Sequence, residues 1–392
     1  MIKMSFLCFL MLFITCGLSL SIVSNVVKAT GDDVIGVRIA DYIIEKWPNP
    51  DRITTKRWEY TNGIIFYGMQ LLYEETKAPQ YYNYIKSWVD QYIDEKGRIS
   101  PIRSGHNLDV IQPSILFYNL YEVSREPKYK LGAAKTRQKY ENFPINSQGG
   151  FWHKANYPNQ MWVDGQYMVI PFISRYGATF AEPGPDQEYC YRTAVYQLKL
   201  LAEHALDHEK NLLYHGWNDQ KNAAWADPVT GLSPEFWCRG LGWYCMALVD
   251  TLEYLPSDYP GYQDLKIILR TVAEGLRTYQ DPLTGLWFQV IDKGDYPGNW
   301  VETSGSAMFV YTLKKAVDKG YIDSQYKAVA LKGWNGVKSM VNFTSTGEMT
   351  IRGTVQGMGI QDSYENYIYQ DTVENYPHGI AAVMMAASVM EY

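Results

Sequence analysis

The segment from Met161 to Met168 places a carboxyl group where proton transfer would need one. Asp164 follows Trp162 by two residues and precedes an apolar run over 167–173. A carboxyl group at the start of a buried helix is partly withdrawn from water, which raises its pKa and favours proton donation near neutral pH. A helix N-terminus acts in the opposite direction, and an aspartate here also fits an ordinary helix cap. Asp164 is therefore a candidate general acid whose net pKa shift the sequence leaves open.

A second candidate for chemistry is Arg239, which lies between Trp237 and Trp243 in an otherwise apolar stretch. A buried guanidinium without a partner is costly, so Arg239 must meet either an acidic side chain or an anionic ligand. Asp109 or Glu302 would serve as the acidic partner. The two tryptophans fit the protein core and a stacking platform for a ligand equally well.

The composition narrows the range of ligands. The chain has 392 residues, of which 46% are hydrophobic and 20% charged, and its formal net charge is -6. A mildly acidic chain without a cluster of Lys and Arg has no electrostatic basis for binding nucleic acid. Its 33 Tyr and 12 Trp are unusual, and many lie in connections rich in Gly, Pro and Asn. Aromatic faces with polar edges suit sugar rings, although most aromatics of a large helical protein are expected in its core.

Two kinds of helical segment alternate along the chain. Amphipathic segments, typical of half-exposed outer helices, cover residues 34–46, 81–95, 128–142, 188–208, 262–278 and 324–341. Segments that are apolar on nearly all sides, typical of helices surrounded by protein, cover residues 62–72, 112–123, 165–176, 239–255, 304–317 and 379–392. Six such hairpins must stack to bury their faces, so the sequence predicts an all-α fold, an (α/α)6 barrel.

Each apolar segment has a polar residue at or just before its start: Glu59, Asp109, Asp164, Arg239, Glu302 and His378. In a ring of hairpins these positions share one end, which we expect to be the mouth of a binding site walled by the long connections 209–234 and 281–301. Free backbone N–H groups of several helix N-termini converge there and favour an anionic ligand such as a uronate. A short strand is expected over 348–352.

The N-terminus predicts export. Lys3 supplies a positive charge and residues 5–23 are almost wholly apolar, which is typical of a signal peptide, although an uncleaved membrane anchor has a similar length. Residues 14–17 loosely resemble a lipoprotein cleavage site at Cys16, and cleavage after Ala29 is the other option. We expect a signal peptide or lipoprotein signal over 1–29, a single catalytic barrel domain over 30–392, and an exported protein that is periplasmic or membrane-anchored through its N-terminus.

Five local motifs occur in order along the barrel: NLDVIQP (107–113), GFWHK (150–154), MWVDGQYM (161–168), YHGW (214–217) and FWCRGLGW (236–243). Together with the six hairpins, they resemble the unsaturated rhamnogalacturonyl hydrolases, glycoside hydrolase family 105, and the related unsaturated glucuronyl hydrolases of family 88. The resemblance covers nearly the whole chain after the export segment.

This resemblance implies an unusual glycosidase reaction. Polysaccharide lyases leave a 4,5-unsaturated uronic acid, galacturonyl or glucuronyl in origin, at non-reducing ends, and the family removes that sugar. Protonation of C4 of the vinyl ether gives an oxocarbenium ion, water adds at C5, and the resulting hemiketal collapses and expels the rest of the chain. The implied partner is a lyase-generated oligosaccharide, and the implied reaction needs no metal or cofactor.

The resemblance also assigns roles by motif position. Asp164 matches the acid/base, and Asp109 matches a second aspartate near the sugar. The substrate-binding positions are Lys154, Trp162, His215, Trp217, Trp237, Arg239 and Trp243. Trp162 and the apolar helices are expected to raise the pKa of Asp164 by removing it from water, and a second carboxylate nearby would raise it further. Glu302 and His378 share the predicted mouth without an assigned role.

Two other functions are compatible with the same residues, and a third lacks the residues it would need. An inverting glycosidase would use Asp109 and Asp164 as its acid and base on saturated chains. A sugar epimerase on a related barrel would need paired histidines, and the six His residues offer no convincing pair. A non-catalytic carbohydrate-binding protein would keep the aromatic pocket and would tolerate replacement of Asp164.

Overall fold

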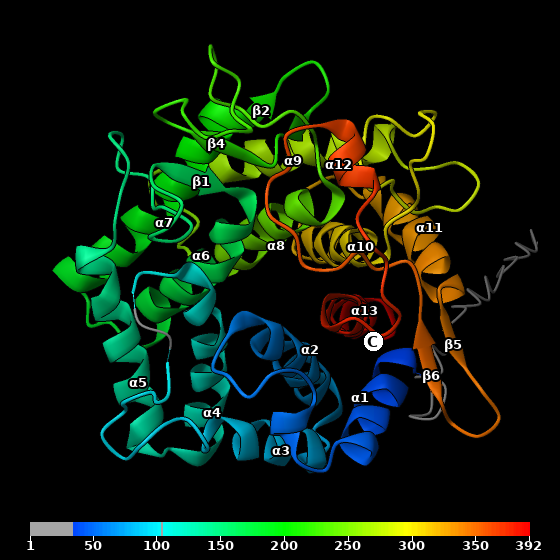
Figure 1. The fold of residues 1–392 in the computed structure, drawn as a ribbon. Helices are drawn as coiled ribbons and strands as arrows, with labels where there is room; N and C mark the ends of the chain where they lie inside the picture. The colour runs from blue at the N-terminus through cyan, green and yellow to red at the C-terminus, as the bar shows by residue number, and fades with distance from the viewer. Residues whose placement is uncertain (1–33, 103–104) are drawn as a thin grey trace, which may run out of the picture.

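The computed structural model describes residues 34–102 and 105–392, so the predicted export segment 1–29 lies outside the described residues. Figure 1 shows two rings of helices seen along the barrel axis. The outer ring contains α1 (Ile35–Lys46), α3 (Pro79–Val89), α5 (Pro127–Gln138), α7 (Pro185–Ala205), α9 (Tyr262–Thr278) and α11 (Tyr326–Ser339). The inner ring contains α2 (Tyr60–Thr76), α4 (Leu116–Ser124), α6 (Val163–Thr179), α8 (Cys238–Tyr254), α10 (Thr303–Asp318) and α13 (Pro377–Met390). This is the predicted (α/α)6 barrel.

The two rings follow from the two sequence patterns. In the outer helix α9 the buried positions recur at Leu265, Leu269 and Leu276, so one face packs on the barrel. In the inner helix α8 every residue over 238–252 is buried, because α6, α9 and α10 surround it. Within residues 34–102 and 105–392, no helix has both the length and the apolarity needed to cross a bilayer.

The last helix closes the ring. α13 packs against α2 on one side and α10 on the other, and Figure 1 shows it beside the first outer helix, α1. Residues 378–388 of α13 are all buried. Just beyond the helix, Glu391 Oε2 accepts a hydrogen bond from the backbone N–H of Gly36 in α1, at 3.3 Å. The described chain therefore begins and ends in the same place.

The second inner element differs from the prediction. The expected helix over 112–123 is divided into a 3-10 turn, η4 (Gln112–Ile115), and the helix α4, while Asp109 lies in a separate 3-10 turn, η3 (Leu108–Val110). Pro113 helps to separate η3 from η4, because proline has no N–H to donate back to the preceding turn. Two further 3-10 turns are η2 (Pro50–Arg52) and η5 (Lys139–Asn142).

Short antiparallel strand pairs join the connections between helices. β1 (Gln160–Trp162) pairs with β4 (Gly216–Asn218), β2 (Leu206–Asp207) with β3 (Leu212–Leu213), and β5 (Val341–Phe343) with β6 (Met349–Ile351). β6 lies within the strand expected over 348–352. The β1–β4 pair links connections that are distant in sequence and sets Trp162 opposite Gly216.

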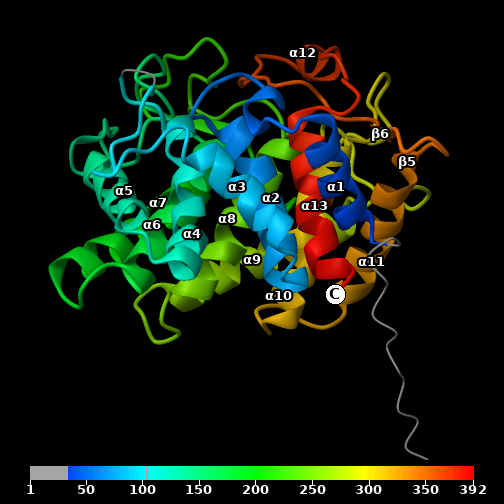
Figure 2. The ribbon, with the colours of Figure 1, turned by 90° about the horizontal axis from the view of Figure 1, so that it is seen from below.

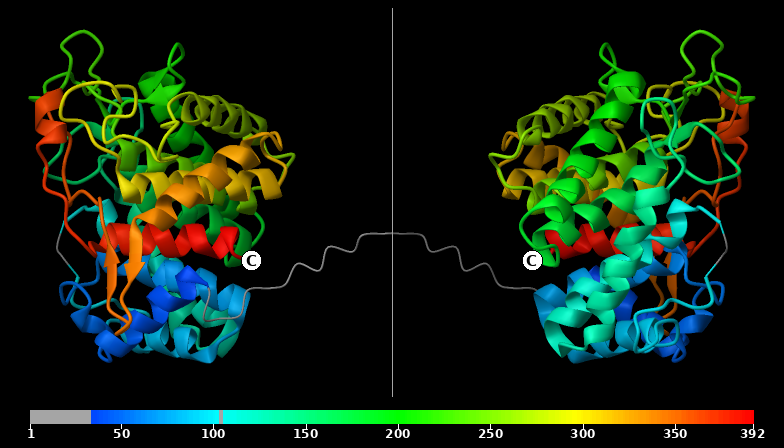
Figure 3. Two further views of the ribbon diagram at one scale, coloured as in Figure 1. Left: turned by 90° about the vertical axis from the view of Figure 1, so that its right-hand side faces the viewer. Right: turned by 90° about the vertical axis from the view of Figure 1, so that its left-hand side faces the viewer.

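The two ends of the barrel differ in construction. Figure 2 shows α12 (Tyr364–Ile368) and long connections over one end, with the last residue of the chain toward the other. The side views in Figure 3 show the same separation. The inner helices begin at the end with the long connections, so their N-termini face the predicted mouth.

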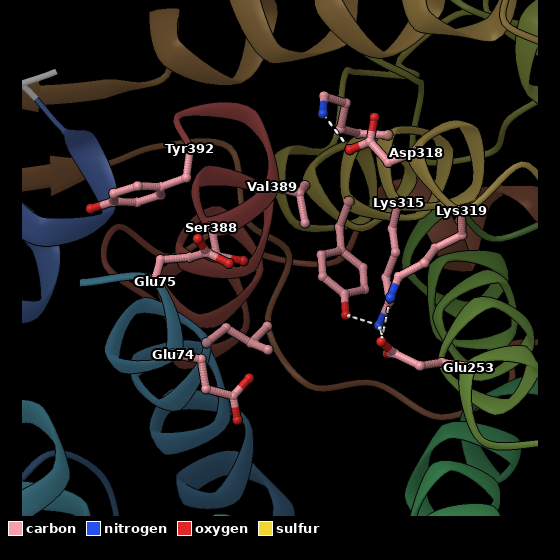
Figure 4. A pocket seen from close by; sticks show the side chains of 12 residues that line it. Glu74, Glu75, Glu253, Lys315, Asp318, Lys319, Ser388, Val389 and Tyr392 are labelled. Carbon is pink, nitrogen blue, oxygen red and sulfur yellow. Dashed lines mark hydrogen bonds and ion pairs between the residues drawn. The ribbon is translucent and has the colours of Figure 1, made fainter. Parts of the chain in front are cut away.

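Ion pairs fill much of the far end, where a cavity of about 320 Å³ is lined by charged side chains (Figure 4). Lys315 Nζ lies 2.7 Å from Asp250 Oδ1 and 2.8 Å from Glu253 Oε2, and Lys319 Nζ lies 2.7 Å from Glu253 Oε1. Burial raises the pKa of Glu253, but the two lysines outweigh it and lower that pKa to about 2. These charges satisfy one another.

Candidate active site

A cavity of about 560 Å³ lies at the mouth, beside the starts of α2 and α6 and below the segment that leads into α13. Four of the predicted site residues line it, namely Asp109, Lys154, Trp162 and Asp164. Both predicted acids thus reach one cavity, as the barrel topology requires. Among residues 34–102 and 105–392, no three His, Cys, Asp or Glu side chains are grouped so that they would hold a metal ion.

Asp164 is the second residue of α6, and the strand pair β1–β4 determines its partner. Trp162 pairs with Gly216, and the backbone N–H of Val163 donates to the carbonyl of His215 at 3.1 Å. This register sets the imidazole of His215 against the acid, with Nε2 3.1 Å from Asp164 Oδ2. The Asp164 side chain keeps 13% of its surface exposed, so it still faces the cavity.

The environment of Asp164 shifts its pKa downward. Burial raises the pKa, but the hydrogen bond that His215 makes and the electrostatic contributions of His215, His153 and Arg239 outweigh burial and leave the pKa of Asp164 below its ordinary value. The net shift that the sequence left open is therefore downward in the unliganded protein, although burial acts in the expected direction. The opposing contact comes from His215, which the family resemblance places in the pocket without connecting it to Asp164.

Asp109 also lines the cavity and is held by its own ion pair. Asn107 caps the turn by accepting the N–H of Asp109 at 3.0 Å, and an isolated bridge pairs Asn107 with Lys154. This bridge brings Lys154 Nζ to 2.6 Å from Asp109 Oδ2, and His153 Nε2 lies 3.5 Å from Oδ1. Because Lys154 compensates its charge, Asp109 is a satisfied carboxylate in a largely buried position.

Trp162 is part of an aromatic stack. Its ring lies parallel to that of His153, with centroids 4.4 Å apart, and to that of Tyr157 at 4.8 Å. The indole N–H donates to Gln160 Oε1 at 3.0 Å. Burial lowers the pKa of His153 to about 4, so this ring is neutral near pH 7 and stacks as an uncharged aromatic. The stack fixes the wall next to both acids.

Arg239 does not line the cavity and instead holds the segment above it. Its guanidinium, 1% exposed, donates to the carbonyls of Val355 at 2.6 Å and Gln356 at 2.7 Å. Glu302 Oε1 lies 3.8 Å from Arg239 Nη1 and accepts the N–H of Val355 at 3.1 Å. Of the two acidic partners considered, the structure pairs Arg239 with Glu302. Together they fasten the residues just before Gly357, which does line the cavity.

Three predicted tryptophans lie in the protein interior. Trp217 stacks on His204 with centroids 3.7 Å apart, Trp237 donates to Gln289 at 3.1 Å, and Trp243 stacks on Tyr167 at 5.1 Å. All three are nearly inaccessible and are outside the cavity wall. For Trp237 and Trp243 these surroundings match the core interpretation that the sequence left open. Trp217, which the family resemblance places in the pocket, instead lies buried outside the cavity wall.

The structure adds cavity residues that no motif indicated. Tyr60 opens α2, and its hydroxyl lies 3.0 Å from Nε2 of His378. Tyr376 stacks on His378 and accepts the N–H of Gly357 at 2.9 Å. His378 therefore contacts two residues of the cavity wall, Tyr60 and Tyr376.

The cavity also includes Glu59, a polar residue before an inner helix, and three residues of the segment before α13, namely Gly357, Met358 and Gly359. This late segment reaches the cavity because α13 closes the ring beside α2.

The helical barrel and its acid-lined cavity define a class of enzyme, the (α/α)6 glycoside hydrolases. Residues 35–392 match the sequence model of Glycosyl Hydrolase Family 88, and the chain belongs to this family. The family resemblance read from the motifs is thereby confirmed.

Individual relatives support this family assignment. A glycoside hydrolase from family 105 of C. acetobutylicum is 30% identical, with 91% of this chain and 98% of that chain aligned at a TM-score of 0.85. The unsaturated rhamnogalacturonyl hydrolase YesR of Bacillus subtilis is 26% identical over 259 residues, 64% of this chain and 68% of that protein. The unsaturated glucuronyl hydrolase of Bacillus sp. GL1 shares the fold, with 14% identity, a TM-score of 0.62 and coverage of 91% and 94%.

Proposed function

We propose that this glycoside hydrolase removes a 4,5-unsaturated uronic acid from the non-reducing end of lyase-generated oligosaccharides. The observation that carries the proposal is Asp164, a carboxyl group in the cavity wall that His215 holds in place. Family membership and the similarity to YesR support the same substrate class. A 560 Å³ cavity accommodates a terminal sugar unit.

The reaction needs one group that gives and then takes a proton. Asp164 transfers its proton to C4, and the C4=C5 electrons form the new C–H bond while C5 becomes an oxocarbenium carbon. Water adds to C5 and returns a proton to the carboxylate. The hemiketal opens to a ketone at C5 and a hemiacetal at C1, which releases the aglycone as an alcohol and leaves an aldehyde.

Substrate binding supplies the protonated acid that the free enzyme lacks. The uronate carboxylate brings a second negative charge into the cavity beside Asp164, and like charges at close range raise each other's pKa. Lys154, whose side chain is 26% exposed, offers the substrate a cation, since an ammonium has donors beyond the one used on Asp109. Proton uptake therefore accompanies binding.

The unsaturated ring itself does not reveal whether the substrate derives from galacturonate or from glucuronate. Galacturonate and glucuronate differ at C4, and the double bond removes that difference. Discrimination must then rest on the leaving sugar and its linkage. We favour pectic, rhamnogalacturonan-derived oligosaccharides, because YesR is named for that substrate. Parallel rates on unsaturated galacturonyl-rhamnose and on glucuronate-derived disaccharides would decide between the two.

The test follows the ultraviolet absorbance of the conjugated double bond in lyase-generated oligosaccharides. The wild type should abolish this absorbance, and Asp164→Asn should reduce kcat by about 10²- to 10⁴-fold, the range for loss of a general acid. Asp258→Asn is the matched control, because Asp258 is exposed and far from the mouth in sequence and fold. Unchanged absorbance with wild type on both substrate groups would contradict the proposal.

Saturated oligosaccharides separate this enzyme from an inverting glycosidase. A vinyl-ether mechanism has no double bond to protonate in such chains, so the wild type should leave them intact. Release of reducing sugar from them at rates comparable to the unsaturated substrate would favour the two-carboxylate mechanism, with Asp109 and Asp164 as acid and base.

The place of action is also a proposal. Residues 1–29 have the composition of an export signal, which supports a periplasmic enzyme or one attached to the membrane through its N-terminus. Fractionation of cells and mass determination of the mature N-terminus would distinguish cleavage after Ala29 from lipid attachment at Cys16.

A further inference from the structure

The hydrogen bond to Asp164 continues one residue further, into the segment that covers the mouth. Tyr367 lies in α12 with 0% of its surface exposed, and its hydroxyl is 2.8 Å from His215 Nδ1. Two side chains hold this helix in place: Gln289 donates to the Tyr367 carbonyl at 3.1 Å, and Trp300 donates to the Ile368 carbonyl at 3.2 Å. The tyrosine is thus rigidly placed behind the histidine.

The direction of the tyrosine hydrogen bond follows from the state of its phenol. Burial raises the pKa of Tyr367 well above its ordinary value, so the phenol keeps its proton. A buried O–H that donates to nothing is costly, and in the described part of the chain His215 Nδ1 lies within hydrogen-bond distance of this hydroxyl. The O–H of Tyr367 is then the donor, and His215 Nδ1 is the nitrogen that accepts.

We infer that Tyr367 is a positioning residue that fixes the tautomer of His215 and thereby selects the oxygen of Asp164 that carries the catalytic proton. With Nδ1 accepting from Tyr367, the proton of the imidazole sits on Nε2 and is donated to Asp164 Oδ2. When Asp164 is protonated, its proton must then reside on Oδ1. This inference rests on the proposed function, because it concerns the delivery of that proton to C4.

Other charged or titratable groups act on Asp164 but do not replace this arrangement. They come from separate elements: Tyr60 from α2, His153 from the connection before β1, Arg239 from α8, and His215 and Tyr367 themselves. Among these, His215 makes the hydrogen bond to the carboxyl group. The tautomer of His215 consequently decides whether Asp164 Oδ2 accepts a hydrogen bond from Nε2–H or donates one to an unprotonated Nε2.

Removal of the phenol should release the tautomer. In Tyr367→Phe, Nδ1 loses its donor, so the imidazole proton is free to move to Nδ1 and Nε2 becomes an acceptor. The proton of Asp164 is then stabilised on Oδ2, facing His215 and away from the substrate. Two effects follow: the pKa of Asp164 rises, because its protonated form gains a hydrogen bond, and the acid becomes less effective.

The kinetic test compares Tyr367→Phe with Tyr369→Phe, a control two residues away whose side chain is 76% exposed. For Tyr367→Phe we expect kcat to fall roughly 10- to 100-fold with KM within about twofold, and the alkaline limb of the kcat/KM profile to move to higher pH. The control should match wild type. A loss of kcat without movement of the limb, or no loss, would overturn the inference.

A spectroscopic test does not depend on turnover. ¹⁵N-labelled histidine, with His215→Gln used to assign the resonance, should show His215 protonated at Nε2 and bare at Nδ1 in wild type, and a redistributed tautomer in Tyr367→Phe. A wild-type His215 protonated at Nδ1 would overturn the inference even if the enzyme is active. If wild type were inactive on unsaturated sugars, the proposed function would fail while this readout still decided the tautomer.

Discussion

At the scale of the residue, the histidines of the mouth divide into hydrogen-bonding and stacking groups. His215 uses both ring nitrogens, on Asp164 and Tyr367. His153 is buried against Trp162 and is neutral near pH 7. The neutral state of His153 has a cost that depends on pH, because the same side chain takes up a proton readily once the protein unfolds.

This cost leads to a stability prediction. The pKa of His153 is about 4 in the folded protein and about 6.5 when exposed, so the unfolded chain binds more protons between these values and stability falls as pH decreases from 6.5 towards 4. Between pH 7 and pH 5 the contribution is about 2 kcal/mol. Urea unfolding at both pH values should show that His153→Gln loses this part of the pH dependence.

A matched variant supplies the control. His208 is exposed, so His208→Gln should retain the wild-type difference between pH 7 and pH 5. His378 is also buried with its pKa lowered well below the ordinary value by burial and by Arg239, so part of the wild-type slope will remain in His153→Gln. An unchanged slope in His153→Gln would contradict the assignment of a neutral, buried ring.

Some residues of the cavity wall could be predicted from the sequence and others could not. Asp164 and Asp109 were indicated by motif and by position before an inner helix, whereas Lys154 was indicated by its motif alone. The contact between His215 and Asp164 spans 51 residues and depends on strand register, so no local pattern reveals it. Whether an indole such as Trp243 faces the core or the cavity depends on neighbours contributed by other helices, which the sequence alone does not place.

At the scale of the element, the alternation of outer and inner helices was predictable except for the divided second inner element, because the hydrophobic pattern of a helix indicates how many of its sides meet water. The irregular segment over 352–376 was not. It has no helical or strand period over most of its length, and its position is set by Arg239 and Glu302, which belong to α8 and the start of α10.

This anchoring gives a prediction for the segment. Arg239→Met should destabilise the protein by about 3–5 kcal/mol, because it leaves Glu302 buried without a cation. In Arg239→Met/Glu302→Gln the unpaired charge is absent, so the loss should be smaller than the sum of the single losses by about 1–3 kcal/mol. Urea unfolding measures the cycle, and hydrogen exchange should show faster opening over 355–359.

The control for Arg239→Met is the same substitution at an exposed arginine. Arg192 is exposed on the outer helix α7, and Arg192→Met should change stability by no more than about 0.5 kcal/mol. Strictly additive losses in the Arg239 and Glu302 variants would mean that the two residues act separately and that the segment is held by other contacts.

At the scale of the whole molecule, the ring depends on its last helix. α13 covers faces of α2 and α10 that are apolar along their length, and Ala382 at its centre is fully inaccessible. We expect removal of residues 377–392 to abolish the cooperative thermal transition followed by circular dichroism, because two inner helices would be exposed to water. A native-like transition in the shortened chain would contradict this role.

A milder change keeps the chain length intact. Ala382→Asp places an unpaired carboxyl group between the inner helices and should cost more than about 4 kcal/mol, in the range of the most disruptive single substitutions. Exposed Ser324→Asp, before α11, should leave the melting temperature nearly unchanged.

The hydrogen bond between Gly36 and Glu391 also determines how the molecule would be oriented on a support. α13 begins at the mouth and ends at Glu391, so α1 starts at the opposite end of the barrel from the cavity. A bead, a surface or a fused carrier attached ahead of residue 34 would therefore stand behind the barrel. Immobilisation through this point should leave access of long oligosaccharides to Asp164 unobstructed, whereas coupling through the exposed Tyr369 should crowd it.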